Sequence, residues 1–190
     1  MENKIIYFED TKNPQNTDKT FQLAADRMKE LGIKKLVLAS TTGITAKQAM
    51  EYFKDTGIKL VIVTHQYGFY RKENPFSQEL AKELRDHGHE VHTATMLFHT
   101  DKLYGTNTPT VIANFLRSFS EGVKVCFEIV LTATDGGYLS NGEKIAVIAG
   151  TGKGADTALI MQASSTQQLK LKVNEILCMP QNELKIEVDN

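Results

Sequence analysis

The chain has 190 residues, of which 41% are hydrophobic, and this is enough to bury one good-sized core. Its 22 basic and 23 acidic residues give a net charge of -1, so the composition predicts neither a nucleic-acid nor a membrane partner. Cys126 and Cys178 are the only cysteines and follow no metal-binding spacing, which favours a reducing compartment over a disulfide scaffold. Because the apolar runs are too short for a signal peptide or a membrane span, we expect a cytoplasmic protein.

Strand-like and helix-like segments alternate over the first half of the chain. The sequence predicts strands at residues 4–8, 36–39, 60–63 and 90–94, with 36–39 as a buried run. Apolar positions at helical spacing predict a helix between each pair of strands, and the first helix has Thr17 as its N-cap and Gly32 as its end. Strands that alternate with helices across short turns predict an α/β protein with a parallel sheet covered on both faces.

The pattern changes in the second half. Thr108 before Pro109 predicts the N-cap of another helix. Residues 123–134 are rich in β-branched residues, yet their apolar positions follow helical spacing and predict a helix. Two predicted strands, 145–149 and 157–162, are joined by so short a turn that the second must run antiparallel. The tail predicts edge strands at 171–178 and 184–188, and the lack of any linker predicts one domain over residues 1–190.

A segment rich in hydroxyl groups, residues 40–46, lies between a predicted strand and a helix, where open α/β sheets bind ligands. Gly43 allows the backbone to approach a ligand closely, and the helix that follows directs free amides and its positive dipole to the same place. A single N-cap needs one hydroxyl, so four of them predict a phosphate or oxyanion site. The hydroxyl groups come from Ser40, Thr41, Thr42 and Thr45.

A second candidate is the glycine-rich sequence GTGKGADTA at residues 150–158. It is not a P-loop, because Lys153 lies between glycines and a strand follows instead of a helix. Two interpretations stay open: a tight hairpin that needs glycine, or a mobile flap whose amides and Lys153 meet a negative group. Its candidate binding residues are Thr151, Gly152, Gly154, Asp156 and Thr157.

Two further segments follow predicted strands, and each contains a histidine. His65 and Gly68 are candidate ligand-binding residues, while His99 has Asp101 nearby to orient its ring. Neither histidine has an identified nucleophile, so the catalytic residues stay unknown. Tyr67, Phe69 and Tyr70 form either a wall for a planar ring or the cover of a core edge.

The remaining polar candidates favour structural explanations. His87, His89 and His92 cluster in sequence, but strand alternation directs His89 and His92 to opposite sides, so we predict no metal site. Glu128 and Asp135 lie in or at the end of an apolar helix. We favour a solvated helix face for both, with a carboxylate that faces the ligand as the alternative.

The sequence LVLASTTGITAKQAMEYF resembles the phosphate-binding loop of the pyruvate kinase C-terminal domain, and GTGKGADTALIM resembles its effector loop. The chain is still more similar to a small family of stand-alone pyruvate kinase alpha/beta-domain-like proteins, through VTHQYGF, KVCFEIVLTATDGGYL and IAVIAGTGKGADTA. The resemblance implies a three-layer α/β/α sandwich, whose mostly parallel five-stranded core sheet ends in an antiparallel strand and carries extra terminal strands.

The resemblance also implies ligands. In allosteric pyruvate kinases the two loops hold a sugar bisphosphate, whereas the stand-alone family binds FMN. The FMN phosphate would lie at residues 40–43 and Thr45, with the glycine-rich segment as the opposite wall. Ile44 stands where kinases often carry a basic residue, which suits a single phosphate.

Kinase chemistry belongs to a separate barrel domain, and a TIM barrel alone needs ~250 residues. We therefore predict no pyruvate kinase activity. The leading hypothesis is FMN binding. The alternatives are a regulatory module that senses a phosphorylated metabolite, and a flavin-dependent oxidoreductase with His65 or His99 as its acid-base group. The related kinase domain packs against copies of itself, so we also expect that a homo-oligomer is feasible.

Overall fold

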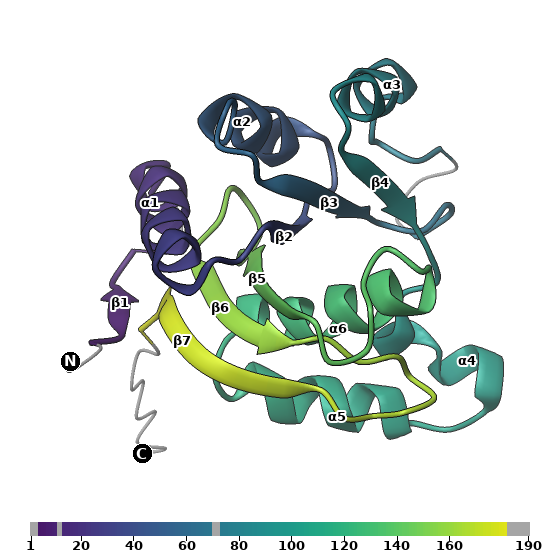
Figure 1. Cartoon of the computed structure of the whole chain (residues 1–190). Helices are drawn as coiled ribbons and strands as arrows, with labels where there is room; N and C mark the ends of the chain where they lie inside the picture. The colour runs from purple at the N-terminus through teal and green to yellow at the C-terminus, as the bar shows by residue number, and fades with distance from the viewer. Residues whose placement is uncertain (1–3, 11–12, 70–72, 182–190) are drawn as a thin grey trace.

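The computed structural model describes residues 4–10, 13–69 and 73–181. Figure 1 shows a central sheet with helices on both of its faces. The strand order is β1-β7-β6-β5-β2-β3-β4. The strands are β1 (Ile6–Phe8), β2 (Lys35–Ala39), β3 (Lys59–Thr64), β4 (Glu90–Thr93), β5 (Lys144–Ala149), β6 (Thr157–Gln162) and β7 (Lys172–Pro180).

Strand directions confirm the predicted mixed sheet. β6 runs antiparallel to both of its neighbours, β5 and β7, and the other neighbouring strands are parallel. The five strands β4-β3-β2-β5-β6 form the expected core, and β7 and β1 extend it. The predicted strand at 171–178 is wrong in one respect: β7 lies between β6 and β1 and is not an edge strand. The strand predicted at 184–188 lies outside the described residues.

The helices form the two outer layers. α1 (Gln15–Leu31), α2 (Ile44–Tyr52) and α3 (Gln78–Asp86) cover one face, and α6 (Glu121–Asp135) covers the other. A connection of three short elements joins β4 to α6, with its last helix packed against α6. These elements are the 3₁₀ helix η1 (Leu97–His99), α4 (Asp101–Tyr104) and α5 (Thr108–Arg117).

Two predicted helix starts are wrong, the first by three residues and the second by one. α1 begins at Gln15 after Pro14, and the Thr17 hydroxyl accepts a hydrogen bond from the amide of Ala155 instead of capping its own helix. α5 begins at Thr108 itself, with Asn107 before it. The predicted stop of α1 at Gly32 is confirmed, and its left-handed φ of 66° is a conformation that glycine adopts without strain.

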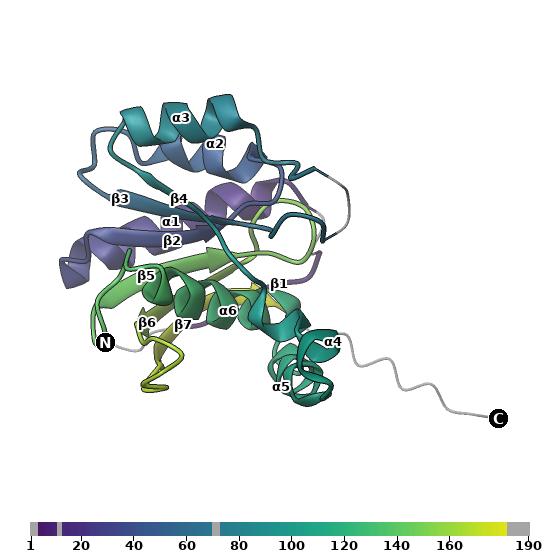
Figure 2. The same cartoon turned by 90° about the vertical axis from the view of Figure 1, so that its right-hand side faces the viewer.

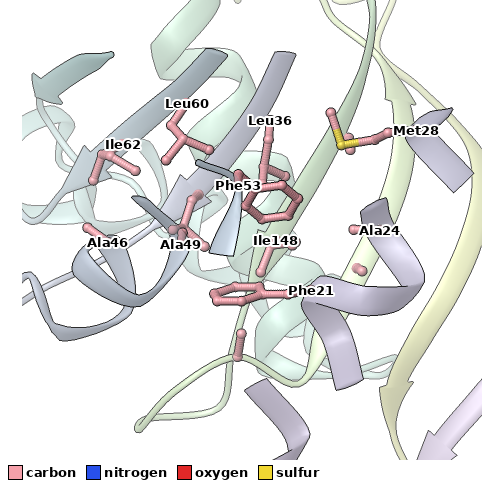
Figure 3. Packing of buried hydrophobic residues seen from close by; sticks show 14 of the residues in the cluster. Phe21, Ala24, Met28, Leu36, Ala46, Ala49, Phe53, Leu60, Ile62 and Ile148 are labelled. Carbon is pink, nitrogen blue, oxygen red and sulfur yellow. The ribbon is translucent and has the colours of Figure 1, made fainter. Parts of the chain in front are cut away.

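Alternating strand residues divide the core into two halves. Figure 3 shows Leu36, Leu60 and Ile62 pointing toward α1 and α2, where Phe21 and Phe53 bring their ring centroids to 5.7 Å. Between them, Val37 and Val61 point to the opposite face and pack against α6. Each fully buried side chain of this size contributes on the order of 2 kcal/mol. This double burial explains why the strands read as continuous apolar runs.

The carboxyl ends of β2, β3, β4 and β5 meet at one edge of the sheet, which we call the carboxyl edge. After β3 the chain crosses to α3 on one face, and after β4 it crosses to α4, α5 and α6 on the other. Such a change of direction opens a crevice between neighbouring strand ends, where α/β proteins bind ligands. The carboxyl edge is therefore the place to examine for a site.

Candidate functional site

The loop after β2 is held open by its own backbone. The Ser40 amide continues the ladder to the Val63 carbonyl at 3.0 Å, and the Ser40 hydroxyl accepts from the Ala46 amide at 3.2 Å. Gly43 then turns into α2 with a φ of 92°, and a Cβ at this position would lie 2.5 Å from the Leu80 side chain. Only glycine fits both the backbone angle and the space.

The start of α2 presents unused hydrogen-bond donors. Among the described residues, the amides of Ile44 and Thr45 have no hydrogen-bond acceptor, because Ser40 reaches only the third amide of the helix. The first turn of α2 contains no acidic residue. Free amides at a helix N-terminus, together with the helix dipole, attract an anion.

The loop after β3 places His65 beside the first loop. The Thr41 hydroxyl lies 3.2 Å from His65 Nε2, and the ring of Phe69 packs edge-on against the imidazole at 5.2 Å. A hollow of about 150 Å³ opens here, and its wall consists of Thr41, Thr42, His65, Gln66, Phe69, Glu73 and Pro75. Burial lowers the pKa of His65, so the imidazole is neutral at neutral pH and acts as a hydrogen-bonding group.

Two other predicted residues of this loop, Tyr67 and Gly68, are not among the described residues that line the hollow. Tyr67 is exposed and its hydroxyl lies 3.0 Å from Gln78 Nε2, and Gly68 forms a turn with a φ of 75°. Tyr70 lies outside the described residues. Of the two described aromatic residues of this loop, Phe69 reaches the hollow and Tyr67 does not. Gln66 also joins this region, because it accepts a hydrogen bond from the Met96 amide and so ties together the loops after β3 and β4.

A buried ion pair between Lys124 and Glu128 lies next to the hollow and is linked to Phe69 through His99. The Lys124 ammonium group lies 2.8 Å from Glu128 and 3.1 Å from His99 Nε2, and the ring of His99 packs against Phe69 at 4.7 Å. An ammonium group can only donate, so His99 is neutral and carries its proton on Nδ1. Burial, followed by the charge of Lys124, lowers the pKa of His99, which agrees with this state.

Two expectations about this region are wrong. Glu128 is buried and accepts from the Phe98 amide at 2.9 Å, so it belongs to no solvated helix face. Asp101 does not orient His99, because its carboxylate accepts from the Thr110 amide near the start of α5. Lys124 was missed, although opposite charges at i and i+4 inside an apolar helix are a visible signal. Asp135 is exposed, as predicted.

The glycine-rich loop after β5 uses its polar groups internally. Asp156 accepts from the Thr151 amide and the Thr157 hydroxyl, both at 2.9 Å. The Ala155 amide donates to Thr17 of α1, and a Cβ on Gly154 would overlap that hydroxyl. Burial raises the pKa of Asp156, and the two hydrogen bonds oppose the shift. The base of the loop is thus fixed between α1 and α6, and its tip at Gly152 and Lys153 is exposed.

Other reactive side chains serve the fold. His89 Nδ1 accepts from the Leu60 amide, and His92 packs on Tyr138 with centroids 4.9 Å apart. Within the described ranges, no group of three or more His, Cys, Asp or Glu residues could hold a metal ion. Cys126 and Cys178 are buried free thiols, and burial raises the pKa of Cys178 to about 11. Neither thiol forms a thiolate readily, which nucleophilic attack requires.

Comparison with known families gives a match to the family described as pyruvate kinase, alpha/beta domain, over residues 18–161. This range includes both candidate loops and the strands from β2 to nearly the end of β6. The chain belongs to the pyruvate kinase alpha/beta domain family. No helix in the described part of the chain is long and apolar enough to cross a membrane.

Solved structures of Cryptosporidium parvum pyruvate kinase are similar to this chain. One shares 14% identity at a TM-score of 0.44 and covers 80% of this chain and 24% of its own. Another, in complex with ADP, shares 15% identity at a TM-score of 0.42, with 80% and 24% covered. The chain therefore spans about a quarter of the length of these enzymes.

Proposed function

We propose that the carboxyl edge binds a phosphate-bearing small molecule, FMN, and that the chain has no pyruvate kinase activity. The observation that carries this proposal is the open start of α2, where the Ile44 and Thr45 amides have no acceptor among the described residues. A phosphate group satisfies such amides and gains from the helix dipole. The hydroxyl groups of Thr41 and Thr42, in the wall of the hollow, are further donors.

The residues around α2 fit a single phosphate better than a bisphosphate. Ile44 is 68% exposed at the first position of the helix and carries no charge. The neutral His65 likewise adds no positive charge. One phosphate is matched by amides and hydroxyl groups, whereas a second would lack a cationic partner at this point.

The apolar wall supports a ring-bearing ligand. Phe69 and Pro75 provide apolar surface beside the hydroxyl groups. Ligand pockets commonly measure about 300–1,000 Å³. The hollow of about 150 Å³ therefore accommodates part of FMN, and the rest extends over the exposed lip. When bound, a flavin supplies hydride and single-electron chemistry, and the protein orients it.

The lack of kinase activity rests on size. Pyruvate kinases place their chemistry in a barrel domain, and such a barrel needs ~250 residues. The chain spans about a quarter of the kinases that it matches. An assay of phosphoryl transfer from phosphoenolpyruvate to ADP tests this part, and turnover by the purified chain would refute it.

The binding test is a fluorescence titration of FMN into the protein, with the Thr42→Glu variant beside the wild type. A carboxylate at this exposed position repels the phosphate and should weaken binding at least ~10-fold. Thr106→Glu, at an exposed threonine in the loop before α5, is the matched control and should bind like the wild type. Gly43 stays unchanged in the test, because any side chain there meets Leu80.

Two results would overturn the proposal in different ways. If the wild type binds no FMN and yet is stabilised by other phosphorylated metabolites in a thermal-shift screen, the ligand would be a sensed metabolite and not FMN. Equal FMN affinity in the wild type and Thr42→Glu would remove the site from the start of α2. An affinity that is the same for oxidised and for chemically reduced FMN would argue against a redox role.

A further inference from the structure

Helix α5 is apolar on two sides but buried on one. Ala113 and Leu116 face the protein, whereas Val111, Ile112 and Phe115 are 45% to 71% exposed. A helix on the surface of a globular protein commonly keeps one apolar stripe and one polar face. The second apolar stripe on α5 is therefore not explained by the fold of this chain.

The neighbouring helix α4 enlarges this exposed surface. Leu103 and Tyr104 are about as exposed as Phe115, and α4 packs beside α5. We call this surface the α4–α5 face, and it consists of Leu103, Tyr104, Val111, Ile112 and Phe115. At ~200 Å² for a large side chain, the five residues expose on the order of 600 Å². This area is at the top of the range for the largest apolar patch on a monomer, ~300–600 Å².

The charge of the face restricts what can cover it. No charged residue occurs between Lys102 and Arg117. A helix that binds anionic lipid has a polar face rich in Lys and Arg opposite its apolar face, whereas residues 103–116 contain neither Lys nor Arg. Two copies of an uncharged apolar face do not repel each other. The ~600 Å² of these five residues is about three quarters of the ~800 Å² that each partner contributes to a stable interface, so the rest must come from polar residues at the rim.

We propose that the α4–α5 face binds the same face of a second copy of this chain, about a two-fold axis that crosses α5 near Ile112. Such an axis makes the two α5 helices antiparallel, so that their dipoles oppose each other favourably. It also brings Arg117, at the end of α5, toward the partner's Asp101, a residue of α4 whose carboxylate accepts from the Thr110 amide in the first turn of α5. This proposal does not rest on FMN binding.

The test is the mass of the protein in solution, measured by sedimentation equilibrium across a dilution series. The wild type should show the mass of two chains. Phe115→Glu buries a charge at the interface and should raise the dissociation constant at least ~30-fold. Leu169→Glu is the matched control, because Leu169 is 71% exposed like Phe115 but lies in the turn before β7, and it should leave the dimer intact.

Circular dichroism checks that each variant is folded. A wild type with the mass of one chain at every concentration would overturn the proposal, since the face would then belong to another partner or to solvent. A Phe115→Glu variant that dimerises like the wild type would overturn it as well, because the contact would lie elsewhere.

A crosslink tests the antiparallel arrangement separately. Residue 112 should face its own copy across the axis, so Ile112→Cys should form a disulfide between chains under oxidation. Cys126 and Cys178 are buried and do not compete. The crosslinked species should appear on a non-reducing gel and be absent when Phe115→Glu is added. A dimer in which Ile112→Cys forms no crosslink would refute this axis.

Discussion

The loop after β2 (residues 40–43) and the loop after β5 (residues 150–156) leave neighbouring strands at the same edge of the sheet. Both are rich in glycine and hydroxyl groups. In the first, the amides of Ile44 and Thr45 that follow the loop have no acceptor among the described residues. In the second, Asp156 takes up the Thr151 amide and the Thr157 hydroxyl, and Thr17 takes up the Ala155 amide.

The comparison shows that a count of donors in a loop does not give the number available to a ligand. The second loop contains its own carboxylate, and that carboxylate occupies the position an anionic ligand would need. The first loop lacks any acidic residue, so its donors stay open. We therefore expect changes in the second loop to affect stability first, and changes in the first loop to affect binding first.

The largest expected effect comes from Gly122→Ala, because Gly122 of α6 packs against the end of the loop after β5. A Cβ on Gly122 would overlap the Thr157 hydroxyl and lie 3.1 Å from Asp156 Oδ1. Helix propensity alone predicts a gain of ~1 kcal/mol for this change. The overlap reverses the sign, and we expect a net loss of ~1–3 kcal/mol in the free energy of unfolding, measured by urea denaturation.

Gln48→Ala, at an exposed position of α2, serves as the control and should change stability by less than ~0.5 kcal/mol. Increased stability in Gly122→Ala would show that the loop after β5 moves aside without loss of stability. The expectation that changes at this loop affect stability first would then be wrong.

Asp156→Asn should destabilise the protein by ~1–2 kcal/mol, because one of its two donors loses an acceptor. The effect depends on pH. Burial raises the pKa of Asp156 in the folded state, so the folded state binds more protons and the wild type loses stability as pH rises from about 4 through the raised pKa. The Asn variant lacks this loss. The difference in stability should therefore shrink as the pH rises from about 4 through the raised pKa of Asp156, and a difference that widens would contradict the buried carboxylate.

The smallest expected effect concerns the loop after β2. Ile44→Arg adds a cation beside the free amides and should strengthen FMN binding ~3-fold at low salt, with a larger gain for a sugar bisphosphate. The helix dipole opposes a cation here by ~0.3–1 kcal/mol, which limits the gain. Ile44→Met is the neutral control. A gain that persists at high salt would exclude a charge effect.

Much of the fold was predictable because burial decides it. Residues 123–134 favour strand by composition, yet their helical spacing matches a stripe that packs Cys126 and Val130 against the sheet. Tertiary packing outweighs β-propensity in such a helix. The antiparallel direction of β6 followed equally from the short turn before it.

Other features depend on partners that are distant in sequence. Glu128 was expected in solvent because its carboxylate accepts from the Phe98 amide, which comes from η1, 30 residues away in the sequence. The elements η1 and α4 span three and four residues, too few to show a period. The open start of α2 was predicted, but the internal use of the second loop required Thr17, which comes from α1.

The pairing of β1 with β7 joins the two ends of the described chain, with Ile6 opposite Cys178. During synthesis β1 emerges before the other described strands, whereas its partner β7 emerges after them. Until then β6 has a free edge next to a nearly complete sheet, and free edges recruit other chains. The last of the described strands to emerge therefore closes the sheet, and a stalled or shortened chain that lacks β7 should be prone to aggregation.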